Sequence, residues 1–388
     1  MYDLVIVGGG VWGCAAALAA LEQGCGRVLL LEASPVLAGE SSGKSGGIMS
    51  EFAGHPDDRV WVARSRALFE AAAQASGDAG MVRRYGRLVV AGTAEAPAFR
   101  RVADELAAEG MVSEMLSPEQ VRARFPLVDG LATDTFGLWT PGAWHLNATG
   151  YAQTIVSAAR ARGLEVRLRH RVHAVRIADD RIRLEGPAGP DGTHATVEGA
   201  RVLIAAGTWT RKLLQTAGID IPYRPYRVQL SSIAFAAAES LPIISETATD
   251  MYITPDGPGS LLVGDGTQLW EHDPDAYEQA GDPAFEAEIA AGLARLVSSA
   301  GDSAHLRRSW AGLCGATPDR RPLLGPVAER LYIACGDNGS GVGRGPALGE
   351  LAARVAMGVE PAPARLDPFR FPSADFRLRP GSGFLVPD

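Results

Sequence analysis

The chain has 388 residues, 46% hydrophobic and 21% charged, which is an ordinary globular composition and excludes a disordered or fibrous protein. A net charge of -8 without a basic stripe argues against a nucleic-acid partner. Four widely spaced cysteines without a CxxC pair predict reduced thiols, no metal site and a cytoplasmic location. The 46 glycines are unusual, and they indicate tight turns and close approaches to a ligand.

The first 32 residues are typical of a strand, a helix and a second strand. Apolar residues predict strands at 2–7 and 27–31, and the Ala- and Leu-rich segment 11–23 predicts a helix. This order forms a βαβ unit of a parallel sheet. The uncharged run 4–21 touches the lower length limit of a membrane span, but its four glycines favour a buried strand and helix, so we expect no span.

Short strands and helices follow along the rest of the chain. Helices are expected at 61–75, 95–109, 149–162, 208–217, 285–297 and 345–357, and strands at 87–91, 164–168, 172–177, 181–185, 193–197, 201–206, 227–236, 251–255, 260–264 and 331–334. Another helix begins at Ser117, where Pro118 and Gln120 complete a capping box. The proline-rich turn at 221–225 predicts a crossing between lobes. The tail after Gly358 is predicted to run along the surface.

The segment GGGVWG at 8–13 fits the pattern G-x-G-x-x-G between the first strand and the first helix. Gly8 suits the tight turn, Gly10 the approach of a pyrophosphate, and Gly13 the packing of the helix on the sheet. Glu32 ends the second strand, where its carboxylate would bind ribose hydroxyls and repel a 2′-phosphate. The alternative is a glycine-rich turn that binds no ligand.

Two further glycine-rich loops favour FAD over NAD as the dinucleotide. They are AGESSGKSGGIMS at 38–50 and GDNGSGVGRG at 336–345, and the second also runs from a strand into a helix. A large flat cofactor needs small residues at several points around it. We therefore predict an FAD-binding, Rossmann-like sheet.

With these loops the chain resembles the D-amino-acid oxidase family of FAD-dependent oxidoreductases, near its glycine and sarcosine oxidases. The resemblance rests on VIVGGGVWGCAAALAALEQGCGRVLLLE, SSGKSGG, RVLIAAGTWTRKLL and WAGLCGATPDRRPLLGPVAERLYIACGDNGSGVGRGPALGELA. It implies a mixed α/β and α+β fold. A discontinuous FAD domain would comprise 1–84, 143–221 and 306–364, an antiparallel-sheet substrate domain 85–142 and 222–305, and a tail 365–388.

The resemblance also implies which residues contact the cofactor and which act in catalysis. The expected FAD contacts are Gly8, Gly10, Val11, Trp12, Gly13, Glu32, Ala33, Ser41, Ser42, Lys44, Ser45, Gly46, Gly47, Ile48, Val172, Ala206, Gly207, Trp209, Gly336, Asn338, Gly339, Ser340, Gly341 and Val342. The expected catalytic residues are Lys44, Tyr252, Arg344 and Cys314. The implied chemistry is hydride transfer from a carbon bearing an amine to flavin N5, giving an imine, followed by reoxidation by O2 or another acceptor.

The sequence departs from its relatives where they bind the substrate carboxylate. Amino-acid oxidases of the family have an arginine where this chain has Cys314, and sarcosine oxidases have basic residues at the positions of Ser50 and Gly343. Cysteine cannot replace the paired hydrogen bonds of arginine. Either Arg344 or Arg308 takes this role, or the substrate is not a simple α-amino acid.

Several candidate residues have a second interpretation. Tyr252 would face the flavin or pack as a strand aromatic. Lys44 would assist O2 near flavin N5 or bind phosphate or solvent. Cys314 lies two positions too close to Asp319 for the covalent flavin link of sarcosine oxidases, so we expect a buried thiol and non-covalent FAD. His145 and His272 would lie near the lobe interface.

The leading function is an FAD-dependent amine or amino-acid oxidase whose partners are a small-molecule substrate and O2. One alternative is a dehydrogenase of the same fold that reduces a quinone or a carrier protein. The other is a flavin-binding subunit without its own substrate site, which the missing carboxylate arginine keeps open.

Overall fold

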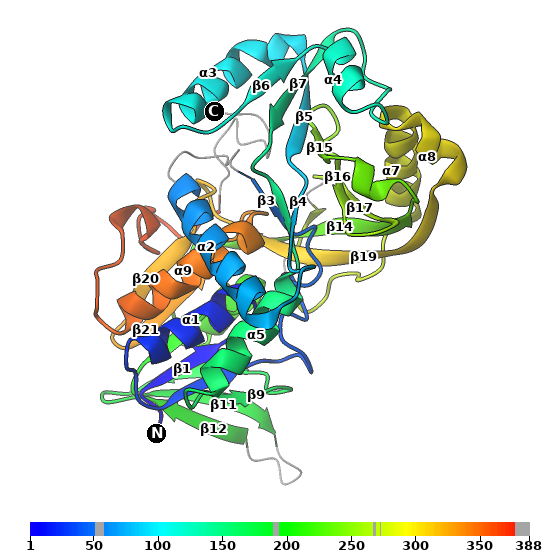
Figure 1. Cartoon of the computed structure of the whole chain (residues 1–388). Helices are drawn as coiled ribbons and strands as arrows, with labels where there is room; N and C mark the ends of the chain where they lie inside the picture. Colours follow the sequence, from blue (N-terminus) through cyan, green and yellow to red (C-terminus); the bar gives the residue numbers. More distant parts are fainter. Residues whose placement is uncertain (51–57, 189–193, 267–268, 272, 377–388) are drawn as a thin grey trace.

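The computed structural model describes residues 1–50, 58–188, 194–266, 269–271 and 273–376. Its α-helices are α1 Val11–Glu22, α2 Asp58–Ser76, α3 Ala96–Ala108, α4 Pro118–Arg124, α5 Ala148–Arg160, α6 Thr210–Gln215, α7 Pro283–Leu296, α8 Ser298–Ser303 and α9 Gly341–Ala356. Short 3-10 turns are η1 Thr93–Glu95, η2 Gly207–Trp209, η3 Ala238–Ser240 and η4 Ala364–Leu366. Two lobes are visible in Figure 1, one around α1, α5 and α9 and one around α3, α4, α7 and α8.

The first lobe is built on a six-stranded sheet of mostly parallel strands. Its strands, in spatial order, are β20 Leu323–Ala328, β21 Leu331–Cys335, β13 Val202–Ile204, β1 Leu4–Val7, β2 Val28–Leu31 and β9 Glu165–Arg167. Only the β20–β21 pair within this sheet is antiparallel. The predicted βαβ unit is therefore confirmed, with β1 beside β2 and α1 between them in the chain.

Two layers cover this sheet and bury its apolar strands. On one face α1 packs against α5 and α9, and α2 packs against α9, in a core rich in alanine and leucine. On the other face lies a three-stranded antiparallel sheet, joined by residues of α6. Its strands are β10 Ala174–Ile177, β11 Ile182–Ala188 and β12 His194–Gly199.

The second lobe is built on a nine-stranded sheet. Its strands, in spatial order, are β18 Leu269–Trp270, β14 Arg224–Ala234, β17 Ser260–Gly264, β16 Tyr252–Pro255, β15 Ile243–Glu246, β5 Arg87–Gly92, β7 Thr135–Thr140 and β6 Glu114–Leu116, with β19 His305–Ala316 paired to β14. The sheet is mixed rather than wholly antiparallel, because β15 pairs with β5 in parallel. The long β14–β19 pair runs from this lobe toward the first one (Figure 1).

The two faces of the nine-stranded sheet differ in character. One face carries Leu88, Ile244, Ile253 and Val263 and packs against α7. Side chains alternate between faces along a strand, so the neighbours of these residues point the other way. Residues paired directly across the strands share a face, and one such row is Leu230, Gly264, Tyr252 and Ser245. This second face is the one directed toward the first lobe.

A small sheet connects the two lobes. Its strands are β3 Ile48–Met49, β8 Trp144–Leu146 and β4 Val82–Arg84, so the end of the second glycine loop pairs with the chain that returns from the second lobe. His145 is buried on β8, and His272 lies outside the described residues.

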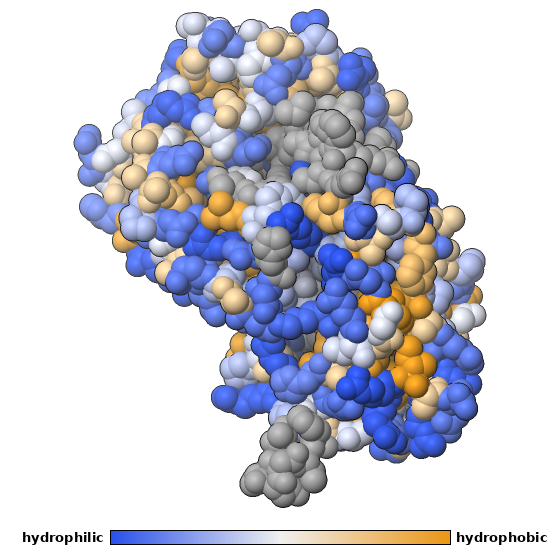
Figure 2. Space-filling model, turned by 180° about the vertical axis from the view of Figure 1, so that it is seen from behind, coloured by the Kyte–Doolittle hydropathy of each residue, from blue (hydrophilic) through white to orange (hydrophobic). Residues whose placement is uncertain are grey.

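The surface in Figure 2 is hydrophilic over most of the visible face, with one hydrophobic cluster at the right of the lower lobe. Within the described residues no helix is long and apolar enough to cross a membrane.

The structure confirms the capping box at α4, where Ser117 Oγ accepts from Gln120 N and the Gln120 side chain accepts from Ser117 N.

The proposed domain boundaries stay a prediction. The six-stranded sheet draws on three separated stretches of chain, as they require. However, β19 pairs within the nine-stranded sheet, although the boundaries assign most of it to the FAD domain.

Candidate functional site

A cavity of ≈ 970 Å³ lies between the six-stranded sheet and the second face of the nine-stranded sheet. Its walls include the carboxyl ends of β1, β2, β13 and β21 at Val7, Leu31, Ala205 and Cys335. In open α/β sheets, ligands bind in the crevice outside these strand ends. The volume lies at the upper end of the range of about 300–1,000 Å³ for small-molecule and cofactor sites.

The first glycine loop has the geometry that a dinucleotide requires. Gly8 has a φ of +113°, and a Cβ there would lie 2.3 Å from the carbonyl oxygen of Ala205. A Cβ on Gly13 would lie 1.9 Å from the carbonyl oxygen of Gly8, so Gly13 brings α1 against the turn rather than lining the cavity. Gly10 lines the cavity directly before α1, whose first turn carries no acidic side chain. The positive end of the helix dipole therefore faces the cavity and suits a phosphate.

Glu32 holds the loop in this conformation. Its carboxylate accepts hydrogen bonds from Gly9 N and from Ser34 N, both at 2.6 Å. Burial raises the pKa of Glu32, while the two backbone donors act in the opposite direction. Glu32 also lines the cavity, beside Ala33 and Val172, which suits the predicted ribose contact.

The second glycine loop links the first to the nine-stranded sheet. Ser42 Oγ accepts from Val11 N at 3.2 Å, and Ser41 Oγ donates to the carbonyl oxygen of Leu313 at 2.6 Å. A Cβ on Gly46 would lie 2.8 Å from the Tyr252 ring, and one on Gly264 would lie 2.5 Å from it. The Tyr252 ring is thus held between two glycines, one in each lobe, and it lines the cavity.

Lys44 lines the cavity, but its ammonium is already bound. Its Nζ donates to Glu40 Oε2 and to Tyr277 OH, both at 2.7 Å. Burial alone would lower the pKa of Lys44, but these hydrogen bonds outweigh burial and raise it. The structure therefore supports a charged Lys44 whose positive charge is shared with Glu40.

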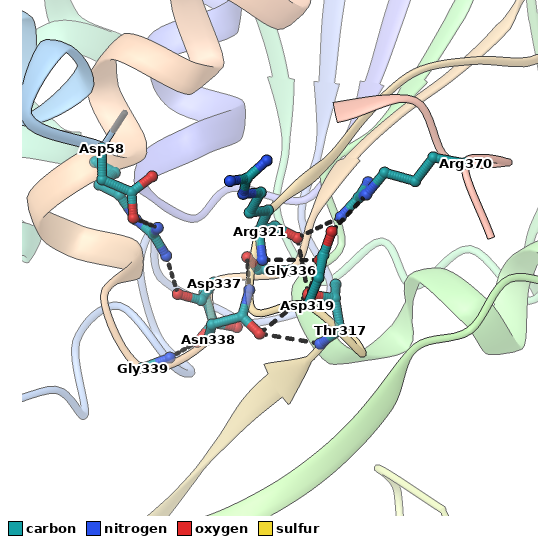
Figure 3. Close-up of polar contacts among 10 residues, drawn as sticks. Asp58, Thr317, Asp319, Arg321, Gly336, Asp337, Asn338, Gly339 and Arg370 are labelled. Atoms are coloured by element: carbon teal, nitrogen blue, oxygen red, sulfur yellow. Dashed lines mark hydrogen bonds and ion pairs between the residues drawn. The ribbon is translucent and has the colours of Figure 1, made fainter. Parts of the chain in front are cut away.

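The third glycine loop is braced by ion pairs and hydrogen bonds (Figure 3). Arg344 pairs with Asp58 and donates from Nη2 to the carbonyl oxygen of Asp337 at 2.7 Å. Asn338 Oδ1 accepts from Thr317 N at 2.9 Å, and Asn338 points away from the cavity into this network. The Arg344 side chain therefore has a carboxylate partner within the chain, and Asn338 supports the loop instead of lining the site.

Asp337 is a half-buried carboxylate of this loop at the cavity wall. It accepts from Gly315 N at 2.9 Å and from Gly339 N at 3.0 Å. Burial raises the pKa of Asp337 and, even more strongly, that of the neighbouring Cys314 thiol. Cys314 lines the cavity as a neutral thiol, because a thiolate would need a depressed pKa to form.

The segment 273–282, here called the strap, passes along the cavity from the second lobe. Asp275 accepts from Trp209 Nε1 at 2.8 Å, from Arg171 at 2.7 Å and from Lys212 at 2.6 Å. All four of these residues line the cavity. Asp275 therefore ties the strap to the first-lobe wall of the cavity.

Most of the predicted site residues lie around this one cavity. They are Gly8, Gly10, Val11, Trp12, Glu32, Ala33, Ser41, Ser42, Lys44, Ser45, Gly46, Gly47, Ile48, Val172, Ala206, Gly207, Trp209, Tyr252, Cys314, Gly336, Gly339, Ser340, Gly341, Val342 and Arg344. Gly13 and Asn338 are not in its wall. The contacts of all the predicted residues with a cofactor, and all the catalytic roles, stay predictions.

Sequence reasoning missed several polar residues of the cavity wall. Among them are Arg87, Gln229, Ser245, Asp250, Asp265, Asp275 and Asp337. Asp337 adjoins a recognised glycine motif and could have been found there. The others lie on strands or turns whose facing direction is set by tertiary pairing.

The glycine loops, the N-terminus of α1 and the Glu32 carboxylate together fit an adenine dinucleotide. Glycine is required in the first loop because a Cβ atom at Gly8 or Gly13 would clash with neighbouring backbone. The fold and site thus define a two-lobed, dinucleotide-binding protein. The chain belongs to the family described as FAD dependent oxidoreductase (DAO), whose model matches residues 3–355. It is therefore an FAD-dependent enzyme.

Two curated relatives illustrate the similarity. Sarcosine dehydrogenase of Mus musculus is 22% identical over 92% of this chain and 40% of its own length. Glycine oxidase of Pseudomonas putida is 30% identical over 50% of this chain and 51% of its own length. The chain thus spans about half or less of the length of these relatives. Among solved structures, L-proline dehydrogenase from P. horikoshii has a TM-score of 0.85 at 21% identity, covering 97% of this chain and 99% of that one, and shares the fold.

Proposed function

We propose that this protein oxidises a C–N bond of a small amine or amino acid to an imine. The observation that carries the proposal is the shared cavity, where the three glycine loops meet the row of Tyr252 and Ser245 on the second lobe. Relatives named for sarcosine, glycine and L-proline support the substrate class. Bound FAD would supply the two-electron acceptor for the hydride, and O2 would take those two electrons with two protons to give H2O2.

The chain itself would bind and orient the substrate. Tyr252 lines the cavity, and because Gly46 and Gly264 confine the ring, its position is fixed before substrate binds. Burial raises the pKa of Tyr252, so the phenol stays protonated and available as a hydrogen-bond donor. The imine would leave to solvent and hydrolyse there.

The four free thiols support the cytoplasmic location that the composition predicts.

One observation favours the second candidate, a dehydrogenase with a quinone or protein acceptor. Lys44 is the lysine that the resemblance places near the flavin, and Glu40 and Tyr277 hold its ammonium. The Glu40 carboxylate partly neutralises the Lys44 ammonium. The ammonium therefore stabilises the negative charge that develops on O2 less strongly than an isolated ammonium would. The two candidates differ only in how the reduced cofactor is reoxidised.

Anaerobic mixing of the FAD-bound protein with a panel of glycine, sarcosine, D-alanine, L-proline and simple amines tests the proposal. We expect at least one of them to bleach the visible absorbance of the flavin, which belongs to the oxidised cofactor. Admission of air should then restore the colour with stoichiometric H2O2. Restoration only by an added quinone would support the dehydrogenase. A panel that leaves the flavin oxidised throughout would contradict both and favour a binding subunit.

A further inference from the structure

Three arginines at the junction of the two lobes make no ion pair among the described residues. Arg83 lies on β4, and Arg307 and Arg308 lie exposed on β19. Arg83 Nη1 donates to the carbonyl oxygen of Gly80 at 3.1 Å. Arg307 Nη2 donates to the carbonyl oxygen of Gly259 at 3.3 Å. Arg308 does not line the cavity, so the structure does not support the carboxylate-binding role considered for it from the sequence.

The turn between β16 and β17 brings these arginines together. Asp256 begins this turn, directly after β16 ends at Pro255. Burial raises the pKa of the Asp256 carboxyl, and the charges of all three arginines act in the opposite direction. A Cβ on Gly257 would lie 3.2 Å from Arg83 Nη2, so the turn packs against this guanidinium. One carboxylate thus faces three guanidinium groups, and we call this set of four residues the basic surface.

A β-bulge in β19 places two of these arginines side by side. Successive side chains of a regular strand point to opposite faces. The pairing with β14 shifts between Ser232 and Ile233, which leaves Arg307 without a partner residue on β14. Both guanidinium groups therefore reach solvent on one stretch of the strand, beside Leu306, which is 49% exposed. Bulges commonly re-aim side chains in this way at sheet edges and near active sites.

Trp310 connects the basic surface with the cavity wall. The Arg308 guanidinium lies 4.7 Å from the centre of the Trp310 ring. The ring Nε1 donates to the carbonyl oxygen of Lys44 at 3.0 Å, and Lys44 lines the cavity. The basic surface is therefore one aromatic ring and one hydrogen bond away from the loop that borders the expected cofactor site.

The make-up of this surface favours a protein partner. Arginine and tryptophan are the residues enriched at the centres of protein interfaces. A membrane or a nucleic acid would extend beyond the arginines onto a chain whose net charge is -8. A small protein contact is confined to the arginines, because exposed charges farther away than about 10 Å are largely screened. Electron-transfer proteins meet through such small, transient interfaces, and opposite charges set their association rate.

We propose that the basic surface docks an acidic electron-carrier protein, which reoxidises the reduced cofactor. The inference deepens the proposed function and rests on it, since it names the partner of the second candidate, the dehydrogenase. Two carrier molecules dock in turn and each takes one electron, while the two protons of FADH2 pass to solvent. The three arginines attract and orient the carrier, and Trp310 holds their strand against the second glycine loop.

The test uses FAD-bound protein whose flavin is reduced by light under anaerobic conditions, so no substrate is needed. Cytochrome b5 is the acidic probe and cytochrome c the basic one, with haem absorbance as the readout. We expect the reduction of cytochrome b5 to slow as salt is added, because screening weakens the attraction. The double variant Arg307→Gln/Arg308→Gln should reduce cytochrome b5 about 10-fold more slowly at low salt. It should reduce cytochrome c no more slowly than the wild-type protein.

Two further double variants separate local charge from structure and from net charge. Arg307→Lys/Arg308→Lys keeps both charges and should keep the rate within about twofold. The matched control, Arg100→Gln/Arg101→Gln, removes the same charge from adjacent exposed arginines of α3, away from the lobe junction (Figure 1). It should not change the rate. Calorimetric titration of the oxidised protein with oxidised cytochrome b5 measures docking without electron transfer, and it should rank the variants in the same order.

Three outcomes would overturn the inference. The first is a glutamine variant of Arg307 and Arg308 that binds and reduces cytochrome b5 as the wild-type protein does at low salt. The second is a wild-type protein that passes electrons to a small quinone but not to cytochrome b5. The third is a basic surface that binds phosphatidylserine vesicles instead of cytochrome b5. Because light replaces the substrate, a failed bleaching panel would count against the proposed function alone.

Discussion

Gly13 has no room for a side chain. A Cβ at this position would lie 1.9 Å from the backbone oxygen of Gly8, and neither backbone segment can move without opening the β1–α1 turn. We therefore expect Gly13→Ala to destabilise the protein by about 3 kcal/mol or more. It should also lower the FAD content of the purified protein, which absorbance at the flavin band would measure.

The control for this substitution is Gly301→Ala in α8. There a Cβ meets only the Ala294 side chain at the ordinary contact distance of 3.5 Å, so the change should be neutral or slightly stabilising. Equal FAD content in the Gly13→Ala and wild-type proteins would refute the close-packing role.

The site residues differ in how far the sequence reveals them. Gly8, Gly10, Gly13 and Glu32 follow from one local motif, since their spacing and the strand before them fix the turn. Arg87 carries no such signal, because an arginine at the start of a strand is usually exposed. Only its pairing beside β15, a contact between residues 158 positions apart, directs it into the cavity.

At the element scale, the strap is fastened to the first lobe by charge. Asp275 is half-exposed, and the hydrogen bonds from Lys212, Trp209 and Arg171 outweigh its burial and lower the pKa of Asp275 to about 2. We expect Asp275→Asn to accelerate FAD dissociation by about 2- to 5-fold, because exposed ion pairs contribute up to about 1 kcal/mol. Flavin fluorescence after dilution would follow the release.

Salt provides a second check on the strap. The difference between wild-type and Asp275→Asn release rates should shrink in 1 M NaCl, where the Debye length is about 3 Å. Asp180→Asn removes an exposed partner of Arg181 outside the cavity wall and should not change release. Identical release rates in the Asp275 variant and the wild-type protein would show that the strap does not retain the cofactor.

The elements themselves were predictable in proportion to their local pattern. α1 and β2 have the expected bounds within one or two residues, since both are continuously apolar. β15 and β19 were missed. β15 is only four residues long, and β19 begins with exposed polar residues and is rich in small ones. Long-range pairing with β5 and β14 stabilises these strands, and no single segment of sequence encodes that pairing.

At the scale of the whole molecule, His145 makes the lobe junction sensitive to acid. Burial, and then the charge of Arg83, lower the pKa of His145 to about 4, although Asp256 lies 3.5 Å away. The unfolded chain therefore binds an extra proton between about pH 6.5 and pH 4, so stability falls as the pH falls through this window. The loss due to His145 should reach about 2 kcal/mol between pH 7 and pH 5.

Urea unfolding of the FAD-bound protein at the two pH values would measure this loss. His145→Gln should reduce the pH dependence by about 2 kcal/mol, whereas His305→Gln, at an exposed position on β19, should not change it. An unaltered pH dependence in His145→Gln would assign the acid sensitivity to other groups.

The sheet of the first lobe combines early strands with late ones, β1 and β2 with β20 and β21, and this has a consequence for biosynthesis. Trp12 Nε1 donates to the carbonyl oxygen of Gly341 at 2.9 Å, and 329 residues separate these partners. A ribosome adding about 5–20 residues per second needs roughly 16–65 s to cover that distance. During this time the β1–α1–β2 unit is without β21 and α9, the last elements of its own core. Over this period the β1–α1–β2 unit of the nascent chain exposes apolar surface, to which chaperones would have access.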